Sequence, residues 1–378
     1  MSPIDLLLIA AMLLSAILLL WPFLFYPLIL RLLPERAIAR EQSGAVSASL
    51  LFCAYNEFAS LPAKIENLRQ LKARHPDLEI LAFDDGSADG TGDLLTAASD
   101  ILTLVRGPGR SGKAHGMKRL AAHASGDVLI FTDANVVLDN DAIERLAPYY
   151  ADPDVGGVLG SLRYGGAESS ASASVGALYW RIEESLKDLE SRSGNVMGAD
   201  GSIFSIRRAL YPDFPDSVLD DLTVSMSVVF AGKRLVKAKD VIAREMMVSR
   251  REDEYRRKVR IAARSWHTHR HLRPQLVRMN RLDRFKYFSR KIVRWFGAAW
   301  IGLGLVAASI LAWRIAPFAA IALAAAGIVL LMLGLTVRRG PLASITDMLL
   351  AYVATLKGVL LAMRGQTFTT WAPAKSRD

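Results

Sequence analysis

Long apolar stretches lie at both ends of the chain, and a segment of short alternating apolar and polar runs lies between them. From Leu6 to Leu30 there is no charged residue, and this run is long enough to cross a hydrocarbon core of about 30 Å as a helix. We therefore expect an N-terminal anchor over residues 1–35. Further membrane or interfacial helices are expected over residues 292–363, in the stretches Ile292–Trp313, Ile315–Val337 and Leu342–Met363. The last stretch contains Asp347 and Lys357, so it either spans the membrane or lies against its neighbours.

Positive charges flank these stretches and predict how they are oriented. Arginine or lysine follows the first stretch, precedes the second and separates the third from the fourth, at Arg31, Arg36, Arg40, Arg290, Lys291, Arg294, Arg338 and Arg339. Because such charges stay on the cytoplasmic side, the N-terminus is expected outside and the middle segment in the cytoplasm. Arg314 then lies in a short outer turn. The sequence predicts an integral protein of the inner or plasma membrane.

Residues 275–296 interleave basic side chains with apolar ones, which predicts an amphipathic helix at the membrane surface. The residues are Arg278, Arg281, Arg284, Lys286, Arg290 and Lys291 with Leu282, Phe285, Tyr287 and Phe288. Since this helix adjoins a predicted span, anionic lipid headgroups are a better partner for it than nucleic acid. We expect no nucleic-acid binding.

The middle segment, residues 45–268, has the alternating pattern of an α/β fold. Strands are expected at Val46–Ala54, Glu79–Phe83, Leu102–Val105 and Val128–Thr132, and helices at positions such as Ser60–Leu71 and Ala142–Tyr150. Alternation of this kind predicts a mostly parallel sheet covered by helices on both faces. Ligands bind such sheets at the carboxyl ends of the strands. Gly165–Ser174 is rich in small residues and is expected to be a loop.

Composition sharpens this picture. The 378 residues carry a net charge of +10 and are 52% hydrophobic, with a mean hydropathy of +0.23. These values exclude an ordinary soluble domain, a disordered tail and a disulfide scaffold. The single cysteine, Cys53, cannot form an internal disulfide and is expected to pack in the core.

Polar and acidic residues follow the first two predicted strands. Tyr55, Asn56 and Glu57 come after the first, and Asp84 and Asp85 begin a glycine-rich run after the second. Because the ends of parallel strands meet at one edge, these side chains are expected to converge. Taken alone, this second run is equally typical of a structural turn and a helix cap.

The next two strands are followed by a basic loop and by a second acidic motif. The loop 107–113 ends in Lys113 and can bring backbone donors and an ammonium to an anion, although its spacing is not that of a Walker A loop. After the fourth strand, Asp133 and Asn135 are two residues apart and can share one divalent cation. Hard oxygen ligands suit Mg²⁺ or Mn²⁺. A simple turn at the strand end is the alternative.

A third acidic motif, the pair Asp220 and Asp221, begins a helical pattern after a loop rich in proline and aspartate. Such a pair can cap the helix and complement its dipole. It can equally place a carboxylate where a general base is needed.

The combination and order of these motifs resemble family 2 glycosyltransferases of the GT-A fold, in the cellulose-synthase-like branch. Further similar phrases are Phe131–Asn135, Asp152–Val158 and Gly198–Arg208. The resemblance implies that Glu57, Asp84 and Asp85 hold the nucleotide base and ribose, with Tyr55 and Asn56 beside them. It implies diphosphate and metal binding at Asp133 and Asn135, donor or acceptor contacts at Asp200 and Asp220, and Asp221 as catalytic base.

Two positions depart from the family pattern. Asn135 stands where the metal motif has aspartate, so Asp133 carries most of the coordination. Processive relatives have Gln-X-X-Arg-Trp, whereas the nearest match here is Arg257-Lys258-Val259-Arg260-Ile261. The tryptophan that stacks beneath the acceptor sugar is missing, which favours the transfer of one or few sugars over polymer synthesis. Arg257, Arg260 and Lys113 are still expected to stabilise the departing diphosphate.

The resemblance predicts an inverting, metal-dependent hexosyltransferase. Its donor is a nucleotide-diphosphate sugar, with a UDP-sugar favoured, and its acceptor a lipid-linked or polysaccharide hydroxyl in cell-surface polysaccharide synthesis. Membrane lipids and polysaccharide-export proteins are expected partners. Two alternatives stay open: a polyprenyl-phosphate glycosyltransferase, and a catalytically silent nucleotide-binding subunit of a synthase. His267, His269 and His271 do not predict a metal site, because alternate residues of a helix point in different directions.

Overall fold

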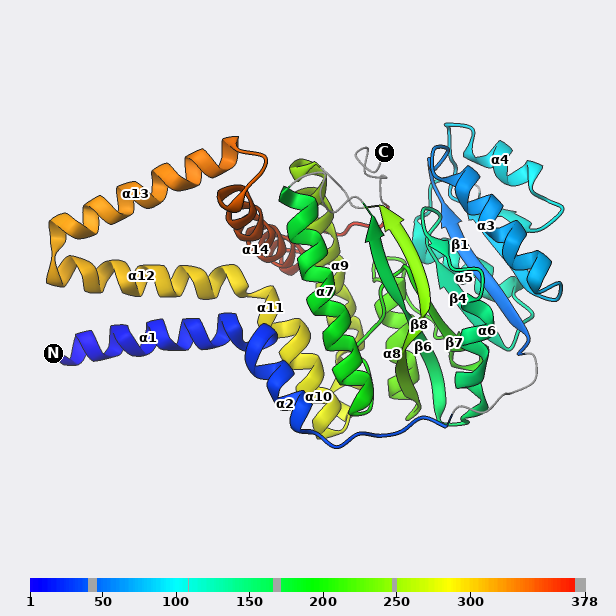
Figure 1. The fold of residues 1–378 in the computed structure, drawn as a ribbon, viewed down its shortest axis with the longest axis horizontal. Coiled ribbons are helices and arrows are strands. Elements are labelled where there is room, and N and C mark those ends of the chain that lie inside the picture. The colour runs from blue at the N-terminus through cyan, green and yellow to red at the C-terminus, as the bar shows by residue number, and fades with distance from the viewer. Residues whose placement is uncertain (40–45, 108, 166–170, 247–249, 371–378) are drawn as a thin grey trace.

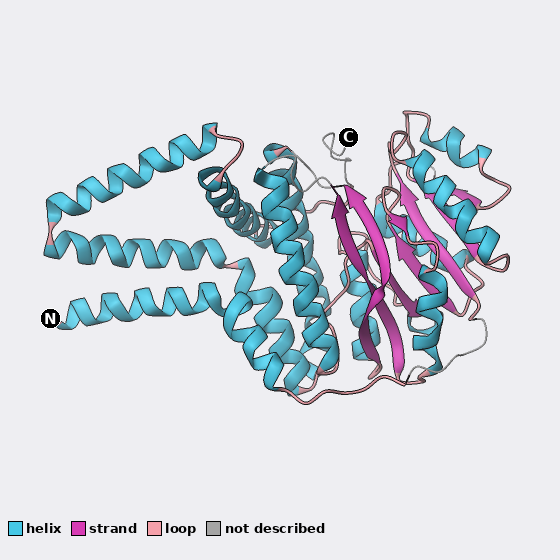
Figure 2. Ribbon diagram, viewed as in Figure 1, coloured by secondary structure: helices cyan, strands magenta, loops and turns pink. Residues whose placement is uncertain are grey.

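In the computed structural model, a sheet flanked by helices forms one part of the molecule, and long apolar helices project from it (Figure 1). The structure describes residues 1–39, 46–107, 109–165, 171–246 and 250–370. Figure 2 shows that the strands lie together in the half of the molecule away from the projecting helices.

Within the described residues, eight strands form one mixed sheet in the order β3-β2-β1-β4-β7-β6-β8-β5. Four neighbouring strands are parallel: β3 (Thr103–Arg106), β2 (Glu79–Asp84), β1 (Ala48–Ala54) and β4 (Val128–Thr132). The other half is mixed. There β7 (Ile203–Arg207) runs antiparallel to β4 and β6, and β8 pairs in parallel with β6 and antiparallel with β5. These last strands are β6 (Val155–Gly165), β8 (Arg234–Met246) and β5 (Val137–Leu138).

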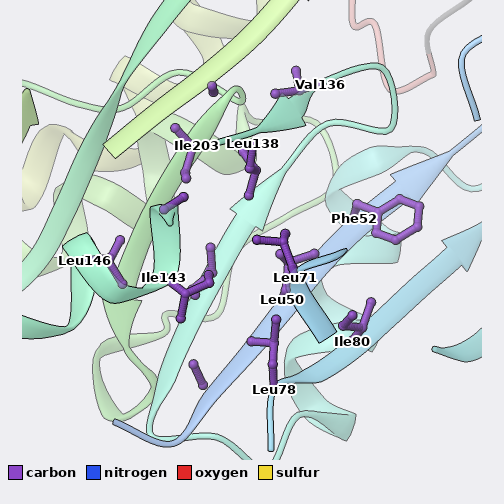
Figure 3. Close-up of a cluster of buried hydrophobic side chains, with 14 of the residues drawn as sticks. Leu50, Phe52, Leu71, Leu78, Ile80, Val136, Leu138, Ile143, Leu146 and Ile203 are labelled. Atoms are coloured by element: carbon purple, nitrogen blue, oxygen red, sulfur yellow. The ribbon is translucent and has the colours of Figure 1, made fainter. Parts of the chain in front are cut away.

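Helices cover both faces of the sheet and bury its central strands. On one face, α3 (Leu61–Arg74), α4 (Thr91–Ala97) and α6 (Ala142–Leu146) enclose a cluster that includes Leu50, Phe52 and Leu138 (Figure 3). On the other face, α5 (Lys113–His123), α8 (Asp220–Phe230) and α9 (Arg251–Arg278) enclose a second cluster. Every residue of β1 and β4 is buried, as expected for strands covered on both faces.

The four predicted strands are confirmed to within two residues, and so is the α/β class with a parallel half. The predicted loop over Gly165–Ser174 is wrong at its C-terminal end, because α7 (Ala171–Arg192) begins at Ala171. Residues 166–170 lie outside the described residues. The predicted helix Ala142–Tyr150 is α6 continued as a 3-10 turn over Ala147–Ala151.

Four helices of the described chain are long and apolar enough to cross a membrane: Pro3–Leu32, Gly297–Ile315, Pro317–Thr336 and Pro341–Met363. The first combines α1 (Pro3–Leu20), a π-helical turn and α2 (Tyr26–Leu32); the others are α12, α13 and α14. These helices confirm the predicted apolar elements. Of the two charged side chains of α14, Asp347 is buried and pairs with Arg251, whereas Lys357 is exposed and its Nζ lies 5.6 Å from the centre of the Tyr255 ring.

The predicted amphipathic helix over residues 275–296 is not one helix. The segment contains the end of α9, then α10 (Arg281–Tyr287), a π-helical turn (Phe288–Ile292) and α11 (Val293–Trp295). Lys286 and Arg290 are buried, and Arg290 pairs with Glu183 and Glu190 of α7. The prediction that these two cations face lipid headgroups is therefore wrong; they hold this segment against α7.

Candidate active site

Lys113 lies at the centre of the acidic residues that follow the parallel strands. It is the first residue of α5, and its Nζ donates to Oδ1 of Asp133 at 2.6 Å and lies 3.6 Å from Oδ2 of Asp220. Although burial lowers the pKa of Lys113, the charges of Asp133, Asp220 and Asp221 raise it above the usual lysine value. The ammonium therefore stays charged and joins the end of β4 to the start of α8.

Asp220 and Asp221 are neighbours in sequence but differ in environment. Asp220 is 5% exposed and lies beside Lys113. Asp221 is partly exposed, and its Oδ1 accepts a hydrogen bond from the backbone N–H of Leu222 at 2.6 Å. Burial, and then the charge of Asp220, raise the pKa of Asp221 to about 7. A carboxylate with such a pKa can accept a proton near neutral pH.

The backbone of Gly201 borders the pair of Lys113 and Asp133. A Cβ at this position would lie 2.9 Å from both Asp133 Oδ2 and Lys113 Nζ. Because Gly201 has no side chain, the Asp133 carboxylate and the Lys113 ammonium can lie directly against its backbone.

Asp85 holds the loop that precedes Lys113. Its side chain is fully buried, and Oδ1 accepts hydrogen bonds from Ser111 N at 2.7 Å, Ser111 Oγ at 2.9 Å and Gly112 N at 2.9 Å. The guanidinium of Arg110 lies 3.3 Å from the centre of the Tyr55 ring. These contacts place the basic loop against the end of β1, where the nucleotide contacts were predicted.

The other residues after β1 and β2 fix the turns around this edge. Asn56 has a positive φ of 51°, and its Oδ1 accepts from Ala88 N. Glu57 accepts from Ser60 Oγ, and Asp84 accepts from Ser87 N. All three lie at the predicted edge of the sheet, but the contacts they make in the structure are those of turn residues.

The side chains that follow β4 fit part of the coordination shell of a divalent cation, with the remaining ligands supplied by a bound molecule. The Asp133 side chain is 35% exposed and offers charged oxygens. Asn135 Nδ2 donates to Glu245 Oε1 at 2.9 Å, while its Oδ1 accepts no hydrogen bond from the described residues. Within those residues, no group of three or more His, Cys, Asp or Glu side chains is placed to hold a metal ion. A cation here needs further oxygen ligands from a bound molecule.

The other predicted site residues, Asp200, Arg257 and Arg260, are not part of the cluster around Lys113. Asp200 pairs with the buried Lys187 of α7 and accepts from Ser202; although burial opposes it, the charge of Lys187 lowers the pKa of Asp200 to about 2. Arg257 donates to Glu254 at 2.8 Å and interacts electrostatically with Glu245. Arg260 follows on the same helix and is partly buried.

Several side chains that hold the site carry no signal in the sequence. Arg264 donates to the carbonyl oxygen of Val218, and Thr268 Oγ1 accepts from Leu219 N at 2.8 Å. Both lie on α9 and fix the loop that leads to Asp221.

Cys53 is buried, as predicted. His267 Nε2 contacts Gln366 O, whereas His269 stacks on Tyr287.

Comparison with known proteins shows which family the sheet-containing part of the chain resembles. Residues 49–214 match glycosyl transferase family 2. A poly-β-1,6-N-acetyl-D-glucosamine synthase of Staphylococcus epidermidis is 23% identical over 195 residues, which are 50% of this chain and 47% of that protein. An N-acetylglucosaminyltransferase of Azorhizobium caulinodans is 27% identical over 35% of this chain and 34% of its own. The chain thus matches about half of the first relative and a third of the second.

A solved structure shares the architecture of nearly the whole chain. A mannosyltransferase from Pyrobaculum calidifontis, solved with GDP-Man and Mn²⁺, superposes with a TM-score of 0.72 and 20% identity, covering 94% of this chain and 98% of its own. The similarity extends over the projecting helices as well as the sheet. Residues 49–214 therefore form a domain that matches glycosyl transferase family 2, and the chain has the GT-A fold, joined to helices that are long and apolar enough to cross a membrane.

Proposed function

We propose that the protein is a membrane-bound inverting glycosyltransferase, which moves a sugar from a nucleotide-diphosphate sugar to a hydroxyl of a lipid-linked or polysaccharide acceptor. The observation that carries the proposal is the placement of Asp221. This carboxylate has a pKa raised to about 7 and adjoins Asp220, whose partner Lys113 also pairs with Asp133. A base and a cluster for binding a leaving group thus lie in one site.

The reaction is a single displacement at the anomeric carbon. The acceptor oxygen forms a bond to that carbon while the bond to the diphosphate oxygen breaks, and the diphosphate leaves with the electron pair. Asp221 takes the proton of the acceptor hydroxyl. One displacement inverts the configuration, so a single base is sufficient.

Positive charge beside Asp133 stabilises the departing diphosphate. The ammonium of Lys113 is already held there at 2.6 Å from the carboxylate. Mg²⁺ or Mn²⁺ held by Asp133 and Asn135 would supply further positive charge against the diphosphate oxygens. Arg257 and Arg260, on α9, are further cations for the substrate.

The names of the relatives suggest which donors to test first. The two curated relatives are an N-acetylglucosamine polymer synthase and an N-acetylglucosaminyltransferase, which supports a UDP-linked N-acetylglucosamine donor. The solved relative holds GDP-Man, which makes GDP-linked mannose the second choice. Asp84 and Asp85 are the proposed contacts for the ribose and base, with Tyr55, Asn56 and Glu57 beside them.

We place the catalytic domain in the cytoplasm, from the positive charges that flank the apolar helices. The structure supports part of this topology. Arg314, in the last turn of α12 just before the turn to α13, pairs with Asp5 of α1 at 2.9 Å. The N-terminus and this turn therefore lie on the same side of the membrane.

The first experiment measures release of nucleoside diphosphate by the purified protein in nanodiscs. UDP- and GDP-sugars are supplied with Mn²⁺ or Mg²⁺ and a lipid extract as the acceptor source. We expect release from one donor by the wild type and at least a hundredfold less by Asp221→Asn, with inverted configuration in the product. Release that is equal in both proteins would contradict a hydroxyl acceptor, because a phosphate acceptor needs no strong base. Binding without release would indicate a silent subunit.

A further inference from the structure

Helix α3 sends two polar side chains beneath the segment that follows β4. Lys64 is fully buried, and its Nζ donates to Val136 O at 2.7 Å and to Thr132 Oγ1 at 3.3 Å. One turn later, Asn67 donates to Leu138 O and accepts from Leu138 N, at 2.8 and 2.9 Å. Together these side chains hold both ends of the segment 132–138, which carries the proposed cation ligands.

We propose that Lys64 is a positioning residue of the cation site, which fixes the turn 132–136 so that Asp133 and Asn135 present their oxygens to one ion. The inference rests on the proposed function. It concerns a residue that forms no hydrogen bond with either ligand side chain and acts through the two residues that flank them, Thr132 and Val136.

Contacts beyond the turn extend this network to the second wall of the site. The hydroxyl of Thr132 accepts from Lys64 and donates to Ser202 O at 2.9 Å. Ser202 follows Gly201, whose backbone borders the Asp133 carboxylate. Lys64 is therefore linked to both segments that surround Asp133. The turn itself is closed by a single backbone hydrogen bond, from Val136 N to Asp133 O at 3.2 Å.

The surroundings of Lys64 make a purely stabilising role a poor explanation. Its neighbours on α3, Leu61 and Leu68, are fully buried, and its ammonium lies 5.7 Å from the centre of the Phe52 ring. Burying a charge costs free energy unless it is paired, and here the acceptors are two neutral oxygens. An apolar side chain of the same length would avoid that cost but would leave the carbonyl oxygen of Val136 without this donor, and so would release the turn.

Two effects of Lys64 on a bound cation oppose each other, so the sign of the result is informative. If positioning dominates, loss of Lys64 weakens cation binding, because groups that orient metal ligands typically contribute 10- to 100-fold in affinity. If charge repulsion between the ammonium and the cation dominates, the same substitution tightens binding.

The test measures Mn²⁺ binding by the full chain in detergent. Free Mn²⁺ is followed by electron paramagnetic resonance in the presence of UDP, with UDP alone as the baseline. For Lys64→Met we expect the Kd of Mn²⁺ to rise at least tenfold. Leu71→Ala is the matched control, since Leu71 is fully buried on the same helix and contacts no part of the turn by hydrogen bond. It is expected to lower the Tm and leave the Kd unchanged.

Each outcome bears on a different claim. If the wild type binds Mn²⁺ and Lys64→Met binds it equally or more tightly, the inference is overturned and the proposed function stands. If the wild type binds no Mn²⁺ above the baseline, the proposed cation requirement fails and the inference fails with it. Should Lys64→Met not fold, Lys64→Gln supplies a polar side chain that is one atom too short to reach both acceptors, so the Kd should still rise. An unchanged Kd in that variant would overturn the inference.

Discussion

Two adjacent carboxylates in the site have different tasks because their surroundings differ. Asp220 lies beside the ammonium of Lys113, whereas among the described residues Asp221 forms no ion pair. Burial, and then the charge of Asp220, disfavour the ionised form of Asp221, so this carboxyl group retains its proton to a higher pH than an ordinary aspartate. Asp220 helps to hold Lys113, and Asp221 is left as the group that exchanges a proton near neutral pH.

The raised pKa of Asp221 predicts a pH-dependent difference in stability. The folded pKa of about 7 lies above the unfolded value, so ionisation of Asp221 makes the folded state less stable as pH rises from about 4 to 7. Asp221→Asn removes this effect. We expect the variant to be more stable than the wild type by about 2 to 4 kcal/mol at pH 8, and equal to it near pH 4. Chemical unfolding at both pH values checks this.

The ionisation of Asp221 that lowers the stability of the folded protein is expected to raise its activity. The base works only when it is deprotonated, so kcat/KM of the wild type rises with pH through about 7 and then levels off. If instead the stability difference between Asp221→Asn and the wild type is the same at pH 4 and pH 8, the group with the raised pKa is not Asp221.

Of the proposed site residues, the sequence correctly placed those that follow a strand or begin a helix. Asp85, Lys113, Asp133 and Asp221 each occupy such a position, where parallel strands converge. It did not locate Glu245, which contacts Asn135 from 110 residues away, nor Lys64. Contacts of this kind depend on which elements lie side by side, and a local pattern does not encode that.

At the scale of elements, the parallel strands were predictable and the mixed half of the sheet was not. Three of the parallel strands, β1, β2 and β4, are mostly apolar runs because both their faces are covered. In β8, by contrast, Lys237 is buried and pairs with Glu184 of α7. A buried charge in the middle of a strand interrupts the apolar pattern, so the pattern gives no strand there.

The segment before α12 shows a second limit of pattern reasoning. Its basic residues predicted a lipid-facing stripe, but Arg290 is 2% exposed and lies between Glu183 and Glu190. Glu190 also accepts from Tyr26 of α2 at 2.6 Å. The acidic partners lie on α7, about a hundred residues earlier, where a local reading does not find them.

Removing Arg290 is therefore expected to destabilise the protein. Arg290→Met leaves two buried carboxylates short of a cation, at a cost of about 3 to 5 kcal/mol. Arg284→Met is the matched control, because Arg284 is exposed in the same segment. Thermal unfolding in detergent should show a much lower Tm for Arg290→Met alone. Equal Tm values for the two variants would mean that the buried pairs contribute little.

At the scale of the whole molecule, α7 connects the membrane helices to the site. Glu183 and Glu190 contact the segment before α12, and Glu190 also contacts α2. On the same helix, Lys187 pairs with Asp200, next to Gly201 and Asp133. The end of the described chain returns to the site as well, where Thr369 O approaches Gly112. The catalytic domain and the apolar helices are thus joined by ion pairs and hydrogen bonds as well as by the chain (Figure 1).

The most direct test of the account is the turnover number of Asp221→Asn at saturating donor and pH 8. Loss of a positioned catalytic group of this kind typically costs about 3 to 4 kcal/mol, so kcat should fall by a factor of a hundred or more. The Kd for donor and Mn²⁺ should be unchanged. Asp213→Asn, an exposed acid in the preceding loop, should retain full activity. A kcat for Asp221→Asn within about threefold of the wild type would contradict the assignment of Asp221 as the base.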